Sequence, residues 1–316
     1  MIDATRNVTL RRRVSGVGMD DLIIDAPQAP QALDLHEPAG APVQAIDHLL
    51  DVPPHPDLAA VVVVPVHDEA GHLPHLIEAL AGQRAVEAAG GRHGYEVILL
   101  FSDCRDGSPE VAAAAARRFP DFVLHRVDVG PDGAALNVGM ARRLLMDAAV
   151  RRLRKVGRER RGVILTTDAD TCVAPDWLAA NLGEIEAGAD AVGGQVLVQP
   201  ADLARLEPGL RRRYLLHHAY QRLISHLEGL IDPDPEDPLP RHHQHASASL
   251  AVAAQTYLEA GGMPALASGE DEAFWRALRR SGARFRHSVR VRTLTSGRLD
   301  GRLVAGLAPT IKSWSV

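Results

Sequence analysis

Two carboxylates one residue apart, Asp168 and Asp170, directly follow a short apolar run at residues 163–165. The run is typical of a buried strand, so the pair falls at its carboxyl end, and Pro175 is the expected first residue of the next helix. In open α/β sheets, ligands bind beyond the carboxyl ends of the strands. Two hard oxygen ligands there suit Mg²⁺ or Mn²⁺ bound to a substrate diphosphate, because such ions keep only one or two protein carboxylates. Aspartate is also an ordinary turn residue, so a simple turn stays open as the alternative.

The composition is that of an ordinary globular protein. The chain has 316 residues, of which 46% are hydrophobic and 24% charged, and its formal net charge of -5 gives no reason to expect a nucleic-acid partner. Its two cysteines, Cys104 and Cys172, cannot form a disulfide framework or a cysteine-ligated zinc site. No stretch reaches the ~18 apolar residues of a membrane-spanning helix. These features predict a reduced, cytoplasmic protein and leave peripheral membrane contact open.

Alternating strand and helix patterns surround the aspartate pair. Apolar runs predict strands at 58–66, 95–101, 122–127 and 163–165, and helical spacing or helix-start signals predict helices after each of them. The helix after the second strand is expected to have Ser108 as its N-cap. Four β/α units in succession predict an α/β fold with a doubly wound, mainly parallel sheet and helices on both faces.

The second half of the chain continues with less regular signals. We expect a strand at 191–198, a helix over 202–231 broken at Pro208, a strand at 246–253, a helix at 271–281 and a strand at 284–294. Residues 232–245 contain four prolines and predict a surface loop that has no core to pack on and orders when a ligand binds. The histidines around this loop, including His242, are interpreted as solvated residues rather than metal ligands.

Five segments resemble family-2 glycosyltransferases with the GT-A fold in both order and spacing: VVVVPVHDE, FSDCRDGS, AALNVG, TTDADT and GEDEAFW. The resemblance covers about residues 58–298. It implies transfer of a sugar, of hexosyl type, from a nucleoside diphosphate sugar to an acceptor hydroxyl, usually with inversion and with Mg²⁺ or Mn²⁺. No Gln-x-x-Arg-Trp segment follows, which predicts a non-processive enzyme.

The resemblance also divides the chain. Residues 1–57 are expected to be an extended or partly ordered arm, 58–300 the GT-A domain and 301–316 a tail. Within the domain, 58–190 would be the nucleotide-sugar-binding half, and 191–300, with the loop 232–245, would be the acceptor half.

Site residues are assigned by position in the family's motifs. Two departures from those motifs are visible: His67 and Asp68 replace the usual Tyr-Asn pair, and Gly133 and Ala134 stand where a basic residue often precedes the AALNVG segment. Asp103 would accept a hydrogen bond from the nucleobase, and Asp271 would be the general base, with Glu270 as its substitute. The resemblance places Pro65, His67, Glu69, Asp103, Asn137 and Asp168 in the nucleotide pocket, Asp170 and Asp168 at the metal, and Asp271 and Glu270 at the acceptor.

Other interpretations stay open for individual residues. Glu69 either contacts the donor or favours the N-terminus of the first helix. Asp271 could instead complete a capping box with Ser268 as N-cap. Ser296 and Arg298 are further residues that could reach a phosphate.

Three other functions are compatible with parts of this pattern. A haloacid-dehalogenase-type phosphatase also uses a strand-end D-x-D, but its motif continues with threonine where Cys172 stands. A nucleotidyltransferase would need a glycine-rich, basic loop after the first strand. A glycosyltransferase-like scaffold without turnover, which binds a nucleotide sugar or a protein partner, stays open.

Overall fold

The computed structural model describes residues 46, 52–84, 94–129, 136–299 and 307–314. Most of the predicted arm, and part of the predicted tail, lie outside these residues. Ile46 is buried in the main core, and the backbone oxygen of Val52 accepts a hydrogen bond from Arg152 (2.8 Å). The described parts of the predicted arm therefore contact the domain.

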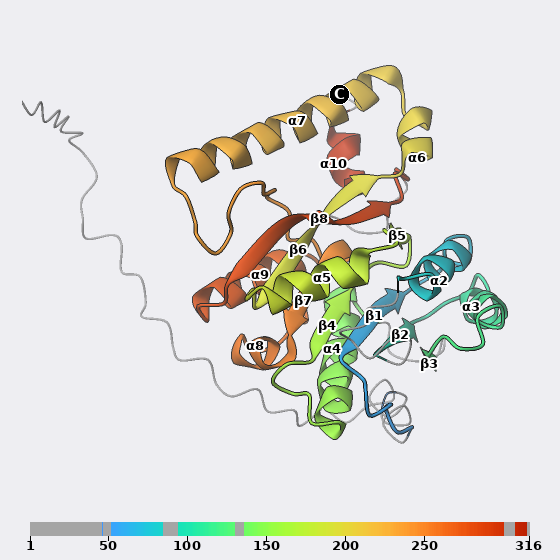
Figure 1. Ribbon diagram of the computed structural model, residues 1–316. Helices are drawn as coiled ribbons and strands as arrows, with labels where there is room; N and C mark the ends of the chain where they lie inside the picture. Colours follow the sequence, from blue (N-terminus) through green and yellow to red (C-terminus); the bar gives the residue numbers. More distant parts are fainter. Residues whose placement is uncertain (1–45, 47–51, 85–93, 130–135, 300–306, 315–316) are drawn as a thin grey trace, which may run out of the picture.

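In the described residues, eight strands form one sheet in the order β3-β2-β1-β4-β7-β6-β8-β5 (Figure 1). Strand β1 pairs in parallel with β2 and β4, as do β2 with β3 and β6 with β8. Strand β7 is antiparallel to β4 and β6, and β5 is antiparallel to β8. The predicted mainly parallel α/β sheet is confirmed. The strands are β1 (Ala60–Val66), β2 (Tyr95–Phe101), β3 (Leu124–Asp128), β4 (Val163–Thr166), β5 (Thr171–Val173), β6 (Ala191–Val198), β7 (Leu250–Ala253) and β8 (Phe285–Thr295).

Helices cover both faces of the sheet. Successive side chains of a strand point to opposite faces. In β1, Val61 and Val63 pack with one set of helices, and Ala60, Val62 and Val64 pack with the other. The first set is α4 (Val138–Lys155), α8 (Ala254–Glu259) and α9 (Glu270–Arg280), and the second is α2 (Leu73–Ala81), α3 (Ser108–Ala116) and α5 (Trp177–Glu186). Burial on both faces explains why the β1 sequence is continuously apolar rather than alternating.

In the described part of the chain, three further helices lie outside these layers: α6 (Pro200–Arg205), α7 (Pro208–Ile231) and α10 (Leu307–Ser313). A small cluster of Val198, Tyr214 and Ile311 joins β6, α7 and α10. The predicted break at Pro208 is confirmed, because α7 starts there with the Glu207 carboxylate accepting hydrogen bonds from the next backbone N–H groups. None of the helices in the described part of the chain is both long and apolar enough to cross a membrane.

Several predicted boundaries are wrong by a few residues. The N-cap of α3 is Gly107, in the left-handed region at φ 80°, and Ser108 is the first helical residue. Helix α5 begins at Trp177 rather than at Pro175. A short 3₁₀ turn, η3 (Ser247–Ser249), precedes β7, and the three-residue β5 was not predicted. Helix ends carry weak sequence signals, and a three-residue strand is too short to show a period.

The predicted loop 232–245 does have partners in the core. Asp237 is 5% exposed and accepts hydrogen bonds from the His287 backbone N–H (2.9 Å) and from Arg286 (2.7 Å), both on β8. His242 is buried, with its Nε2 3.2 Å from the Ser288 oxygen, and burial lowers its pKa to about 3. The interpretation of His242 as a solvated residue is therefore wrong. The loop's partners lie about fifty positions along the chain, beyond what a local pattern shows.

Candidate active site

A cavity of about 550 Å³ opens at the carboxyl ends of β1, β2 and β4. These strands are parallel neighbours, so their carboxyl ends meet at one edge of the sheet. Of the nine predicted site residues, seven line this cavity: Pro65, His67, Glu69, Asp103, Asn137, Asp168 and Asp170. The predicted site residues that follow different strands therefore line the same cavity.

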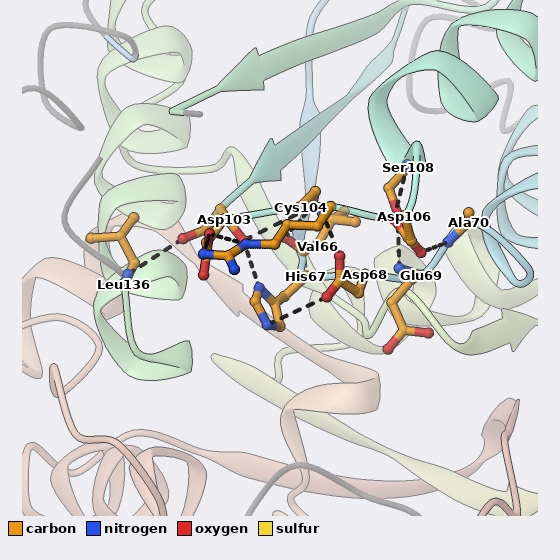
Figure 2. Close-up of polar contacts among 12 residues, drawn as sticks. Val66, His67, Asp68, Glu69, Ala70, Asp103, Cys104, Asp106, Ser108 and Leu136 are labelled. Atoms are coloured by element: carbon orange, nitrogen blue, oxygen red, sulfur yellow. Dashed lines mark hydrogen bonds and ion pairs between the residues drawn. The ribbon is translucent and has the colours of Figure 1, made fainter. Parts of the chain in front are cut away.

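The loops after β1 and β2 hold each other in place beside the cavity (Figure 2). Asp68 and Asp103 both have a φ of 50°, a backbone conformation that aspartate tolerates better than most residues. The Arg105 backbone N–H donates to Asp68 Oδ1 (2.7 Å), and its side chain donates to Asp103 Oδ1 (3.1 and 3.2 Å). His67 Nδ1 lies 2.7 Å from the Ser102 backbone oxygen. The unusual His67-Asp68 pair thus positions the loop that presents Asp103.

Asp106 and Ser108 form a second connection between the same loops. The Asp106 carboxylate accepts hydrogen bonds from the Ala70 N–H (2.8 Å) and from the Ser108 N–H and hydroxyl (3.0 and 2.6 Å). Ser108 Oγ in turn accepts from the Glu69 N–H (2.8 Å). Burial raises the pKa of Asp106, but these hydrogen bonds outweigh it and leave the pKa below its usual value. Asp106 therefore connects the loops, whereas Asp103 lines the cavity.

Asn137 has a structural role as well as a place on the cavity wall. It is the N-cap of α4, and its side chain accepts a hydrogen bond from the Met140 N–H (2.8 Å). Two residues on, a Cβ at Gly139 would lie 2.3 Å from the Leu266 backbone oxygen. Glycine at this position lets the start of α4 approach the segment that carries Ala267, another residue of the wall.

The D-x-D pair lies in the turn between β4 and β5, with each carboxylate next to an arginine. Arg142 Nη2 donates to Asp168 Oδ1 (2.5 Å), and Arg298 Nη2 lies 3.0 Å from Asp170 Oδ2. Burial and the neighbouring Asp168 charge raise the pKa of Asp170 to about 6. The backbone does form a turn here, as the alternative interpretation requires, but the side chains reach the cavity.

Arg142 was not predicted as a site residue. It is buried, and besides Asp168 it contacts Thr166 Oγ1 (2.8 Å) and Glu270 Oε1 (3.3 Å). Its position among the apolar residues of α4 is the sequence signal that could have identified it, because an arginine on the buried face of a helix needs carboxylate partners. Arg142 places positive charge in the site although the residue that often precedes the AALNVG segment is absent from this sequence.

Arg298 provides a second positive charge and contacts two predicted site residues. Its guanidinium makes two contacts with Glu69, one of them at 2.9 Å, in addition to its contact with Asp170. Glu69 also accepts from His72 Nδ1 (2.9 Å), and this hydrogen bond raises the pKa of His72. Glu69 lies four residues before α2, and its carboxylate lines the cavity. Glu69 therefore lies on the cavity wall rather than in the first turn of α2.

Glu270 and Asp271 are not among the described residues that line the cavity. Glu270 is buried and reaches the cavity wall through Arg142, and burial raises its pKa. The Asp271 carboxylate accepts from the Glu272 N–H (2.8 Å). The alternative capping box is wrong, because the N-cap of α9 is Gly269, in the left-handed region at φ 73°, rather than Ser268. Both acids follow Ala267, a residue of the cavity wall, by three and four positions in the chain.

The end of the chain also contributes to the cavity wall. Thr295 is the last residue of β8 and Ser296 follows it. The Ser296 N–H donates to the Asp170 backbone oxygen (3.1 Å), which ties this segment to the D-x-D turn. Leu307, Ala308 and Pro309, at the start of α10, complete this side. Part of the predicted tail therefore belongs to the site.

The donor set fits a particular kind of metal. The described residues contain no group of three or more His, Cys, Asp or Glu side chains arranged to hold a metal ion. Asp168 and Asp170 nevertheless present two carboxylates on one wall. Mg²⁺ is usually held by one or two carboxylates together with substrate phosphates. The site thus fits a divalent metal that arrives with a diphosphate.

Comparison with solved structures gives similar folds at low identity. GalNAc-T7, solved with UDP, GalNAc and Mn²⁺, superposes with a TM-score of 0.53 at 13% identity, over 81% of this chain and 47% of that one. The mannosyltransferase PcManGT from Pyrobaculum calidifontis, with GDP-Man and Mn²⁺, gives 0.49 at 19% identity, over 83% and 66%. Glucosyl-3-phosphoglycerate synthase from Mycobacterium tuberculosis gives 0.42 at 15% identity, over 83% and 78%. This chain spans about half to three quarters of these proteins. The superposition on GalNAc-T7, whose TM-score exceeds 0.5, supports the predicted GT-A fold.

Comparison at the level of sequence identifies the family. A search of curated proteins gave no match. The profile of glycosyl transferase family 2 matches residues 61–235, which is more than half of the chain and includes the loops after β1, β2 and β4. The chain therefore belongs to glycosyl transferase family 2.

Proposed function

We propose that this cavity binds a nucleoside diphosphate sugar together with a divalent metal and that the protein transfers the sugar to an acceptor hydroxyl. The observation that supports this most is the meeting of Asp168, Asp170, Arg142 and Arg298 on one cavity at the carboxyl edge of the sheet. The cavity volume lies within the ~300–1,000 Å³ of typical small-molecule sites. The alternative, a non-catalytic scaffold, predicts binding of the nucleotide sugar without turnover.

The donor would lie along the cavity from Asp103 to the D-x-D turn. Asp103 would accept a hydrogen bond from the nucleobase, since its carboxylate is held at the wall by the loop contacts of Arg105. Asp170, with Asp168, would hold Mg²⁺ or Mn²⁺, which as a Lewis acid neutralises charge on the departing diphosphate. Arg298 would exchange its contact with Asp170 for one with the diphosphate.

For the acceptor we propose Asp271 as the general base. An alcohol is a poor nucleophile at neutral pH, so a positioned carboxylate is needed to take its proton as it attacks the anomeric carbon. Glu270 is less suited, because its charge is already compensated by the buried Arg142. A direct attack of this kind, with one displacement at the anomeric carbon, would invert its configuration and suits a hexosyl donor.

Turnover of nucleotide sugars by the purified protein tests this proposal. We expect release of nucleoside diphosphate from at least one hexosyl donor, in a panel of UDP- and GDP-sugars, with Mn²⁺ or Mg²⁺ and not with EDTA. The assay needs no acceptor, because slow transfer of the sugar to water would also release nucleoside diphosphate. Asp176→Asn is a matched control, because Asp176 follows the same turn but lies outside the cavity wall. Metal-dependent binding without release from any donor would support the scaffold instead.

A further inference from the structure

Helix α7 carries an apolar stripe on the side that faces away from the rest of the molecule. Its buried residues are Leu210, Tyr214, Ser225 and Gly229. With 3.6 residues per turn, its large exposed residues fall mainly on the opposite side. Figure 1 shows α7 along the outer edge of the molecule, next to α10. The exposed residues, at 50–82%, are Leu215, Leu216, Tyr220, Leu223, Leu227, Leu230 and Ile231.

The spacing within this stripe is that of a helix-pairing seam. Leu216, Tyr220, Leu223, Leu227 and Leu230 follow one another at alternating intervals of four and three residues. This is the repeat with which two helices pack along a shared seam. A helix of 24 residues is about 36 Å long, so the stripe is a continuous apolar surface of the kind that marks an interaction site.

We propose that α7 is a homodimer interface in which two copies of the chain pack their α7 helices antiparallel around Leu223. The stripe matches its own reverse to within one residue, which is about 1.5 Å along a helix. When a second helix is turned end for end about Leu223, Leu216 lies opposite Leu230 of the second copy, and Tyr220 lies within one residue of the position opposite Leu227. Self-complementarity of this kind is what a two-fold symmetric interface requires.

The charges at the two ends of the stripe favour the same arrangement. Arg211, Arg212 and Arg213 lie at the start of α7, whereas Glu228 and Asp232 lie at its end. Antiparallel packing brings the arginine end of one copy to the acidic end of the other, and parallel packing would oppose like charges. A helix lying on an anionic membrane carries basic residues along its polar face. The acidic end of α7 favours a second copy of the chain over such a surface.

This interface would also hold an element next to the cavity. Through Tyr214, α7 packs against Val198 of β6 and Ile311 of α10. Tyr214 Oη accepts the Val198 N–H (3.1 Å), and α10 contributes to the cavity wall. Dimerisation would thus support the side of the site formed by the end of the chain.

Sedimentation equilibrium of the full chain tests the proposal. We expect twice the monomer mass of 34.0 kDa at concentrations up to about 100 µM, a range that includes weak but specific association. Leu223→Glu places two like charges at the symmetry axis and should leave only monomer. Ala114→Glu, at an exposed position of α3, is the control and should remain dimeric. Far-UV circular dichroism spectra like that of the wild type show that both variants are folded. The monomeric variant should melt at a somewhat lower temperature, because it lacks the stabilisation from association.

A charge exchange tests the antiparallel orientation. Arg212→Glu should weaken the dimer at least about tenfold, and adding Asp232→Arg should restore it. Wild-type protein that stays monomeric at about 100 µM overturns the proposal, whether or not it binds vesicles containing phosphatidylserine. A dimer that survives Leu223→Glu also overturns it, and failure of the double variant to recover overturns the antiparallel orientation.

Discussion

Asp170→Asn is expected to stabilise the ligand-free protein at neutral pH, although it removes a proposed metal ligand. Burial, with the neighbouring Asp168 charge, raises the pKa of Asp170 from 3.8 to about 6. The folded state therefore binds a proton more tightly than the unfolded state. The resulting loss of stability is absent well below pH 4, grows as the pH rises towards 6 and is fully present above that value. At 1.36 kcal/mol per pKa unit it reaches about 3 kcal/mol at pH 7.5 and about 1 kcal/mol at pH 4.5.

The variant also loses the contact between Asp170 and Arg298. Arg298 loses its partner at 3.0 Å but keeps both contacts with Glu69. The pKa of about 6 already includes the attraction of Arg298, which lowers the pKa of Asp170, so the net stabilisation at pH 7.5 should stay at about 3 kcal/mol.

Asp168→Asn is the matched comparison, with the opposite expected sign. Asp168 neutralises the buried guanidinium of Arg142, and removing it leaves Glu270 as the remaining carboxylate partner. Breaking a fully buried pair costs about 3–5 kcal/mol, but Asp168 is 35% exposed. We therefore expect a loss of about 1–3 kcal/mol.

Urea unfolding in EDTA at pH 7.5 and pH 4.5 measures both variants. The structure predicts opposite changes in the free energy of unfolding at pH 7.5, from two substitutions two positions apart. It also predicts that the gain from Asp170→Asn becomes smaller at pH 4.5. An Asp170→Asn variant that is destabilised at pH 7.5, or equally stabilised at both pH values, would refute the reasoning.

Three further substitutions test the proposed roles. Arg298→Gln should lower nucleoside diphosphate affinity at least about tenfold while Mn²⁺ alone binds more tightly, because a competing cation is removed; unchanged nucleotide affinity in calorimetry would count against this role. Asp103→Ala should raise the donor KM at least about tenfold and lower stability by no more than roughly 1–2 kcal/mol, the strain of alanine at a positive φ; a variant with a normal KM would make Asp103 a turn residue only. Asp271→Asn should lower kcat about a hundredfold or more with donor affinity nearly unchanged. Transfer at the wild-type rate would move the role of base to Glu270.

The fold could be predicted largely from the sequence because its strongest features are local. The β1 run and the helical spacing that follows it are local features of the chain, and β6 has the predicted bounds. The cavity was predictable for a related reason. In a parallel sheet, residues that follow different strands share one edge, so Asp103 and Asp168 were expected in one space without any knowledge of their contacts.

The arginines and the loop could not be predicted in this way, because their roles depend on partners distant in the sequence. Arg142 meets Glu270 across 128 positions, and Arg298 meets Glu69 across 229. The local sequence around Asp237 indicates only a solvated acid in a loop. In the folded chain, Asp237 accepts a hydrogen bond from Arg286 of β8. Charge pairs of this kind have no periodic pattern, so only the folded chain shows which carboxylates share a cation.

Calorimetric titration of UDP and GDP, each with Mn²⁺ and with EDTA, tests the central claim most directly. We expect at least one nucleotide to bind about tenfold or more tightly with Mn²⁺ than with EDTA. This difference should disappear in Asp170→Asn and persist in Asp176→Asn. Nucleotide binding that does not depend on Mn²⁺, or that keeps its Mn²⁺ dependence in Asp170→Asn, would contradict the assignment of the metal to the D-x-D pair.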